Sequence, residues 1–163
     1  MNYVYGTSGV LRAMEALGLT SVPECARAAN WLRSVQNPDG GFGESHHSYA
    51  DSNWRGKGKS TASQTAWGLI GLLAVSGPDD SAVQAAVKYL VSTQNEDGTW
   101  DEEEFTGTGF PSVFYLKYHL YRNSFPLYAL ARYRNLRDGA VEFSGCKPGP
   151  QGIRYRKLGW GQE

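Results

Sequence analysis

The chain has 163 residues and a formal net charge of zero, from 16 Lys and Arg against 16 Asp and Glu. That length suits one domain able to bury about 70% of its unfolded surface, and the absence of a basic excess gives no electrostatic reason to expect a nucleic-acid partner. Aromatic residues make up 13% of the sequence, which favours a large apolar cavity or an interface over a simple solvated bundle.

Localisation signals are sparse. The longest nearly apolar run, residues 66–75, is too short to cross a bilayer, and no signal peptide is recognised. Cys25 and Cys146 stand alone without metal-ligand spacing, so a reducing, cytoplasmic compartment is expected.

Two helices are predicted in the first quarter of the chain. Apolar residues at helical spacing begin at Val10, and Gly18 closes that pattern as a C-cap. Ser21 and Glu24 have the spacing of a capping box, which predicts a second helix running to Gln36. A long polar loop, residues 37–59, follows.

The next two predicted helices also open with capping-box spacing. Thr61 and Gln64 precede a segment that is apolar almost all round, so this helix should be enclosed by its neighbours. The dipeptide Gly77-Pro78 ends it. A further box begins at Ser81 and predicts a helix that runs to residue 94.

An aromatic segment, residues 106–126, follows a second Asp-Gly loop. Four rings recur at spacings of 4, 4 and 3, which predicts one aromatic helix face; they belong to Phe110, Phe114, Tyr118 and Tyr121. Such a face is suited either to a buried core or to a wall that stabilises positive charge. Phe125-Pro126 should break this helix and start a last one at 127–136. No segment alternates with period two, so the fold class is all-α, with six helices in residues 1–138 and a disordered, Gly- and Pro-rich tail at 139–163.

An internal repeat relates residues 30–42 to residues 88–100 at an offset of 58. The identical pairs are Leu32/Leu90, Ser34/Ser92, Gln36/Gln94, Asn37/Asn95, Asp39/Asp97 and Gly40/Gly98, and the aromatic Phe42 answers Trp100. Each copy ends a helix in Gln, turns at Asp-Gly and places an aromatic residue two positions later. That period corresponds to helical hairpins arranged side by side. We expect each Gln amide to bind the exposed backbone at the end of a neighbouring helix, so the motif holds helices together and carries no chemistry.

The repeat resembles the Gln–Trp motif of the triterpene cyclases. The segments GKGKSTASQTAWGL (residues 56–69) and TGTGFPSVFYLKYHLYRNSFP (residues 106–126) resemble the bacterial squalene–hopene cyclases in particular. The resemblance covers residues 2–133 and implies the last part of a catalytic (α/α)6 barrel. It also implies polycyclisation of squalene to hopene or hopanol without a cofactor or a metal, by a peripheral membrane enzyme of which this chain would be the C-terminal portion.

The resemblance assigns roles by position. Phe110 and Phe114 match aromatic residues that stabilise the later ring cations, and Tyr118 and Tyr121 match cavity aromatics nearer the early rings. Two further residues complete the implied cavity: Leu116 is of steric importance and Tyr5 lies close to the proton source. The family's acid, an Asp-x-Asp-Asp run, does not occur in this sequence. The chain is therefore expected to be inactive without the remainder of a cyclase or another copy.

Two other hypotheses about the class of protein also fit the helical pattern. A prenyltransferase-like toroid would need zinc, and its candidate ligands share one loop without a Cys at ligand spacing; they are Glu44, His46, His47 and Asp51. A non-enzymatic helical-hairpin module would pair with a second chain through a large apolar patch. A hydrolase built on Ser60, His46 and Asp51 lacks a nucleophile elbow.

Overall fold

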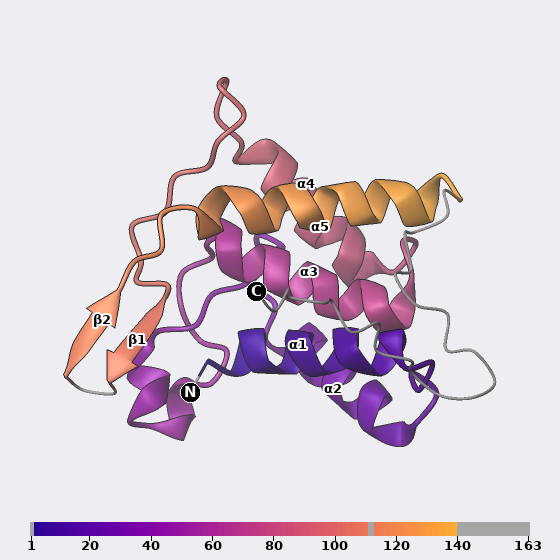
Figure 1. The fold of residues 1–163 in the computed structure, drawn as a ribbon, viewed down its shortest axis with the longest axis horizontal. Coiled ribbons are helices and arrows are strands. Elements are labelled where there is room, and N and C mark those ends of the chain that lie inside the picture. Colours follow the sequence, from indigo (N-terminus) through magenta and orange to yellow (C-terminus); the bar gives the residue numbers. More distant parts are fainter. Residues whose placement is uncertain (1, 111–112, 140–163) are drawn as a thin grey trace, which may run out of the picture.

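The computed structural model describes residues 2–110 and 113–139. Five α-helices form the body of the molecule (Figure 1): α1 (Tyr3–Ala16), α2 (Pro23–Ser34), α3 (Ala62–Ser76), α4 (Ser81–Ser92) and α5 (Tyr121–Arg137). Two short 3-10 turns, His46–Tyr49 and Ser52–Trp54, lie in the first long loop. A two-stranded antiparallel hairpin of β1 (Gly107–Phe110) and β2 (Phe114–Leu116) projects from one end.

The helices form two layers. Figure 1 shows α1, α3 and α5 in front, with α3 between the other two, and α2 and α4 behind them. Helix α3 contacts each of the other four helices. This arrangement of helical hairpins side by side confirms the predicted all-α architecture, to which the structure adds one small hairpin of strands.

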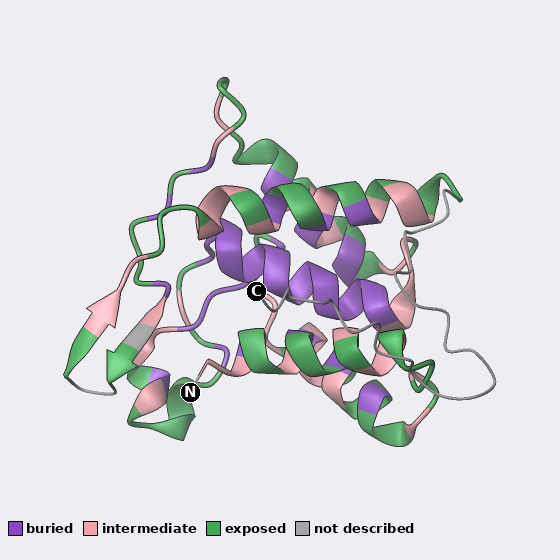
Figure 2. Cartoon of the chain, viewed as in Figure 1, coloured by how far each residue is buried: buried purple, intermediate pink, exposed green. Residues whose placement is uncertain are grey.

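Helix α3 is the centre of the core. Every residue in it is buried except the last two, as predicted from a sequence that is apolar all round (Figure 2). The Thr61 hydroxyl accepts a hydrogen bond from the Gln64 N–H at 3.3 Å, and Gly77, at a φ of 76°, ends the helix. Glycine also permits close packing inside α3, because a Cβ added at Gly68 would lie 2.6 Å from the buried ring of Phe42.

The other helix starts differ from the predicted capping boxes. Helix α2 begins at Pro23 without a side-chain cap, because proline itself suits the first helical position. Helix α4 is capped by Asp80 rather than by Ser81, and its carboxylate accepts from the N–H groups of Ala82 and Val83. Helix α1 begins at Tyr3, several residues before the apolar pattern, where the Asn2 side chain accepts from the third N–H of the helix.

The predicted aromatic helix over residues 106–126 is wrong. Its first half is the hairpin, with Gly107 opposite Leu116 and Phe110 opposite Phe114. Helix α5 then runs through Pro126 without a break, so the described residues hold five α-helices rather than six. The glycines of this segment explain the error: Gly109 lies where an added Cβ would be 2.0 Å from the Phe114 ring, a contact that requires glycine. The predicted tail lies outside the described residues beyond position 139.

Candidate functional site: aromatic rings at the ends of the front helices

The predicted site residues fall into two groups rather than on one helix face. On the hairpin, the rings of Phe110 and Phe114 meet edge to face at 5.7 Å and are 64% and 43% exposed. Leu116, at the end of β2, is half-buried. Tyr118 lies in the connection to α5 and stacks on Tyr121, the first residue of α5, at 4.9 Å and 24°.

The second group is built around Trp67 in α3. Its ring contacts Tyr5 of α1 at 4.8 Å and Phe125 of α5 at 5.5 Å, in both cases edge to face. Tyr121 completes the cluster, 4.9 Å from Phe125 and 6.2 Å from Trp67. Three neighbouring front helices therefore each contribute a ring near their N-terminal ends. Trp67 is buried, whereas Tyr5 and Tyr118 are about half exposed, at 49% and 47%.

Sequence reasoning did not assign Trp67 and Phe125 to the site. In the sequence, Trp67 belongs only to the enclosed apolar segment, and Phe125 only to the dipeptide expected to break a helix. A signal for them was present, because the two residues are separated by the same 58 positions as the two copies of the repeat. Extending the repeat from the loops into the helices that follow would have placed both rings at one level of neighbouring helices.

A third set of rings fixes the base of the hairpin to the first long loop. His46 lies 4.5 Å from Tyr115 and 5.7 Å from Phe105, and the rings of Phe105 and Tyr115 stack at 5.5 Å. These contacts hold the strands that carry Phe110 and Phe114 against the body of the protein.

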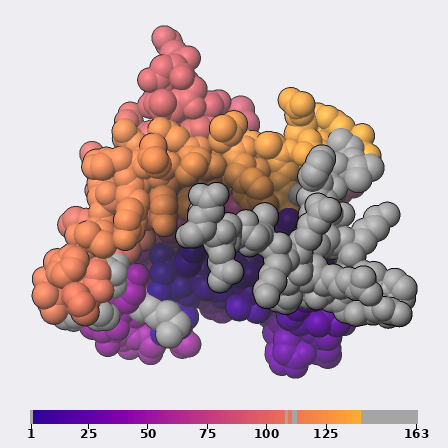
Figure 3. All heavy atoms as spheres, in the orientation of Figure 1, coloured from indigo at the N-terminus to yellow at the C-terminus, as the bar shows by residue number. Residues whose placement is uncertain are grey.

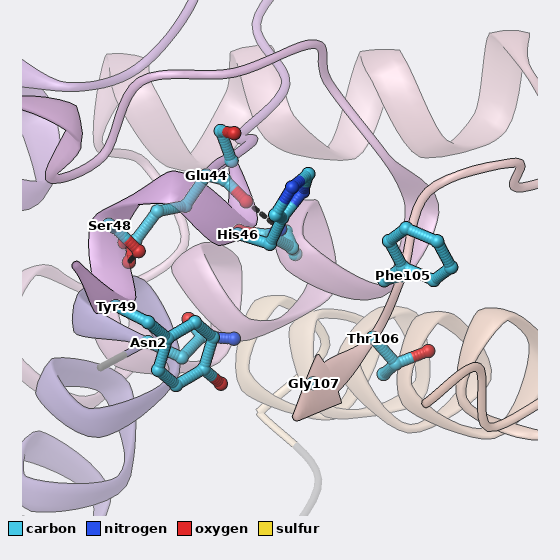
Figure 4. A pocket seen from close by; sticks show the side chains of 10 residues that line it. Asn2, Glu44, His46, Ser48, Tyr49, Phe105, Thr106 and Gly107 are labelled. Carbon is cyan, nitrogen blue, oxygen red and sulfur yellow. Dashed lines mark hydrogen bonds between the residues drawn. The ribbon is translucent and has the colours of Figure 1, made fainter. Parts of the chain in front are cut away.

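Two cavities of very different size lie in the described chain away from the Trp67 cluster. A cavity of about 10 Å³, enough for roughly one water molecule, lies between the first long loop and the hairpin (Figure 4). An open hollow of about 490 Å³ lies at the first Asp-Gly loop, beside Asp39 and Tyr89. Neither of these two is lined by the Trp67 cluster, whose outer rings are instead on the surface of this chain.

The two buried carboxylates of the described chain are helix caps. Glu44 accepts hydrogen bonds from the backbone N–H groups of Tyr3 and Val4 at the start of α1, and from the Ser48 hydroxyl at 2.7 Å. Glu102 accepts from the N–H and the hydroxyl of Ser63 at the start of α3, at 2.9 and 2.8 Å. Each negative charge thus lies at the positive end of a helix dipole.

No group of three or more His, Cys, Asp and Glu side chains suited to a metal ion occurs within residues 2–110 and 113–139. In the loop that the zinc hypothesis singled out, Glu44 is occupied by backbone donors and Asp51 caps a short turn by accepting from the Asn53 N–H. His46 and His47 stack on each other, with ring centroids 4.3 Å apart.

The side-chain amides of Gln36 and Gln94, in the two repeated loops, have different hydrogen-bond partners. The Gln36 side-chain amide donates at 2.9 Å both to the Gly40 carbonyl of its own loop and to the Ala82 carbonyl in the first turn of α4. The Gln94 amide donates to the Gly98 carbonyl at 2.9 Å, and Gln94 itself is exposed.

The fold and the ring cluster define a class: helical hairpins in repeat, with aromatic rings gathered at one end of the front layer. Comparison with known families identifies that class. The family described as squalene-hopene cyclase C-terminal domain matches residues 1–135. The chain therefore belongs to the squalene–hopene cyclase family.

Individual relatives agree with this assignment. The chain is 53% identical to a squalene–hopene cyclase of Bradyrhizobium diazoefficiens over 85% of its length, and 50% identical to that of Alicyclobacillus acidocaldarius over 82%. It is 47% identical to a dammaradiene synthase of Dryopteris crassirhizoma, over 82% of the chain. The chain spans only about a fifth of the length of these relatives, namely 21%, 21% and 22%.

No helix in the described part of the chain combines the length and the apolar character needed to cross a membrane.

Proposed function

We propose that this chain is the C-terminal portion of a squalene–hopene cyclase and forms part of the wall of the cavity in which squalene is cyclised to hopene or hopanol. The observation that carries the proposal is the ring cluster of Tyr5, Trp67, Tyr118, Tyr121 and Phe125, drawn from three neighbouring helices and the connection that precedes α5, and partly open to the surface. Family membership supports the same conclusion.

Aromatic rings suit a reaction that passes through carbocations. A ring face offers negative potential to a cation, worth about 2 kcal/mol when the contact is desolvated, yet does not readily trap it covalently. Because each 1.36 kcal/mol corresponds to tenfold in rate, one such contact changes the rate of a cyclisation step about 30-fold. The proposed role of the Tyr5, Tyr118, Tyr121, Phe110 and Phe114 rings is to stabilise successive cations.

The chain supplies this wall but not the acid that starts the reaction. In the proposal, the remainder of a longer cyclase brings the proton donor and encloses the squalene-type substrate, while the whole enzyme works as a peripheral membrane protein. Leu116, half-buried beside the hairpin rings, would limit the shape of the folded substrate.

The test is a pair of substitutions in a full-length cyclase whose C-terminal portion is replaced by this chain. Phe114→Ala removes a ring that is 43% exposed, and the slower late step should let earlier cations lose a proton, so products with fewer rings should accumulate. Tyr115→Ala is the matched control, because the Tyr115 ring packs on His46 and Phe105. This control should mainly lower thermal stability and should change the product mixture less than Phe114→Ala does.

Gas chromatography of the products decides between the two roles. If Phe114→Ala lowers total turnover while the ratio of products stays that of the parent enzyme, the hairpin rings only pack and the proposed role in cation stabilisation is wrong.

A further inference from the structure

The small cavity between the first long loop and the hairpin, of about 10 Å³, is bordered mainly by polar groups. The loop and the hairpin meet at one end of the molecule (Figure 3), where His46 lies 4.5 Å from Tyr115. Helices α1 and α3 also reach the cavity, through Asn2 and Gln64. All of the described lining residues except Phe105 and Gly107 carry a polar side chain. The cavity therefore lies where four segments of the chain converge.

Gln64 brings an unused acceptor to this cavity. The residue lies in the first turn of α3 and is only 4% exposed. Its side-chain nitrogen donates to the Glu44 carbonyl at 3.0 Å, which directs the side-chain oxygen the other way. This Oε1 atom is buried and accepts no hydrogen bond from any residue that the structure describes. Because a buried amide oxygen without a donor is destabilising, we expect its partner in the cavity that Gln64 lines.

Asn2 brings an unused donor to the same cavity. Its side-chain oxygen accepts from the Tyr5 N–H at 3.1 Å and so caps α1. Within the described chain this is the only hydrogen bond of the Asn2 side chain, and it fixes the orientation of the amide. The NH₂ group must then face away from Tyr5. Figure 4 shows the nitrogen of Asn2 directed toward the space between the first long loop and the start of β1.

One water molecule matches these two groups in size and in chemistry. A cavity of about 10 Å³ is close to the smallest that holds a water. Water can accept from Asn2 and donate to Gln64 at the same time, and the Tyr49 hydroxyl, which also lines the cavity, offers a third partner. A cation suits the site poorly because an N–H donor faces it. The nearby Glu44 carboxylate already accepts from three backbone N–H groups and a hydroxyl.

We propose that this cavity is a binding site for a single buried water molecule that bridges Asn2 and Gln64. Asn2 caps the helix that carries Tyr5, and Gln64 lies three residues before Trp67 in α3. The water thus joins the N-terminal ends of α1 and α3 at the level where the Tyr5 and Trp67 rings meet at 4.8 Å. It acts as a structural part of the ring cluster, and the proposal does not depend on the activity of any cyclase.

A crystal structure of the unaltered chain at high resolution tests the site directly. We expect one ordered oxygen in the cavity, at about 2.7–3.2 Å from both the Gln64 oxygen and the Asn2 nitrogen. If the cavity contains no ordered oxygen, or one that bonds to only one of the two amides, the proposal is wrong.

A double-mutant cycle tests the bridge in solution. Asn2→Ser keeps a good N-cap for α1 but removes the NH₂ donor, and Gln64→Met keeps the length of the side chain but removes the amide. Asn2→Ser should lower the Tm of the parent chain by about 2–4 °C. In the Gln64→Met background the same change should cost about 1 °C or less, because the water has already lost its acceptor. Gln64→Met also breaks the bond to Glu44, but the cycle cancels that loss because it is present in both variants compared.

The matched control uses Gln84→Met. The Gln84 amide donates to the Pro78 carbonyl and the Tyr133 hydroxyl, and Gln84 does not line the cavity. In this background Asn2→Ser should lower the Tm by as much as it does in the parent chain. If the effect of Asn2→Ser is the same in all three backgrounds, Asn2 and Gln64 act independently and no water bridges them.

Discussion

At the scale of single residues, the N-termini of α1 and α3 are each capped by a carboxylate that lies far away in the sequence. Glu44 accepts a hydrogen bond from the N–H of Tyr3, which lies 41 residues away in the sequence. Glu102 accepts one from the N–H of Ser63, which lies 39 residues away. Helix ends leave backbone donors without partners, and a carboxylate there also gains from the helix dipole. Such caps were not predictable from local spacing, although Glu44 and Glu102 are themselves separated by the repeat offset of 58.

The cap of α4 should make stability depend on pH. Burial tends to raise the pKa of Asp80, but hydrogen bonds from Arg33 and from the Val83 and Ala82 N–H groups outweigh it and hold that pKa below its ordinary value. A lowered folded-state pKa means that the contribution to stability is complete above the unfolded pKa, near 4, and is lost as the pH falls through the folded value.

Asp80→Asn keeps a capping side chain but removes the charge that pairs with Arg33 at 2.8 Å. We expect it to lower the free energy of unfolding by about 1 kcal/mol at pH 7, and we expect this difference to shrink as the pH falls below about 4. Urea unfolding at several pH values measures it, with exposed Asp79→Asn as the control. A difference that stays constant down to pH 3 would contradict the assignment.

At the scale of elements, the sequence was most informative where several local signals agreed. Helix α3 was predicted because Thr61 provides a cap, Gly77 provides a stop, and the residues between them are apolar on every side. The hairpin was missed because its rings happen to recur at helical spacing. Gly109 fits beneath the Phe114 ring, a contact between residues five apart that only the folded hairpin reveals.

Two glycines in helices should respond in opposite ways to substitution by alanine. Gly68→Ala would place a methyl group 2.6 Å from the buried Phe42 ring, so it should destabilise the protein by about 1–3 kcal/mol. Gly9→Ala, in α1, meets nothing within 4 Å and should stabilise by about 0.5–1 kcal/mol through helix propensity. Chemical denaturation of both variants measures the free energy of unfolding. If Gly68→Ala changed it as Gly9→Ala does, the Phe42 ring could move away from the added methyl group without destabilising the protein.

At the scale of the whole molecule, the structure brings only some of the predicted site residues together. Tyr5, Tyr118 and Tyr121 do come together, because α1, α3 and α5 stand side by side with Trp67 between them. Phe110 and Phe114 were predicted on the same helix face and instead pair on a hairpin. Helical periodicity describes the spacing of residues along one segment. It does not predict contacts between rings of different helices, because these depend on which helices pack side by side.

The chain alone is expected not to cyclise squalene. Protonating an alkene needs a strong acid positioned in a dry site, and the two buried carboxylates of the described residues, Glu44 and Glu102, are taken up by helix N-termini. The measurement is product analysis after incubating the purified chain with squalene in detergent, with a full-length cyclase as the positive control. Hopene above the level of a protein-free sample would refute the expectation.

The central position of α3 has a consequence for how the protein opens. Because α1, α2, α4 and α5 all pack against this one helix, its amides can exchange with solvent only when most of the structure comes apart, whereas α2 or α4 can detach singly. Native-state hydrogen exchange should therefore report a single high opening energy throughout α3 and graded, lower values outward from it. The protein would then unfold from its outer helices inward, and α3 would be the last element to open.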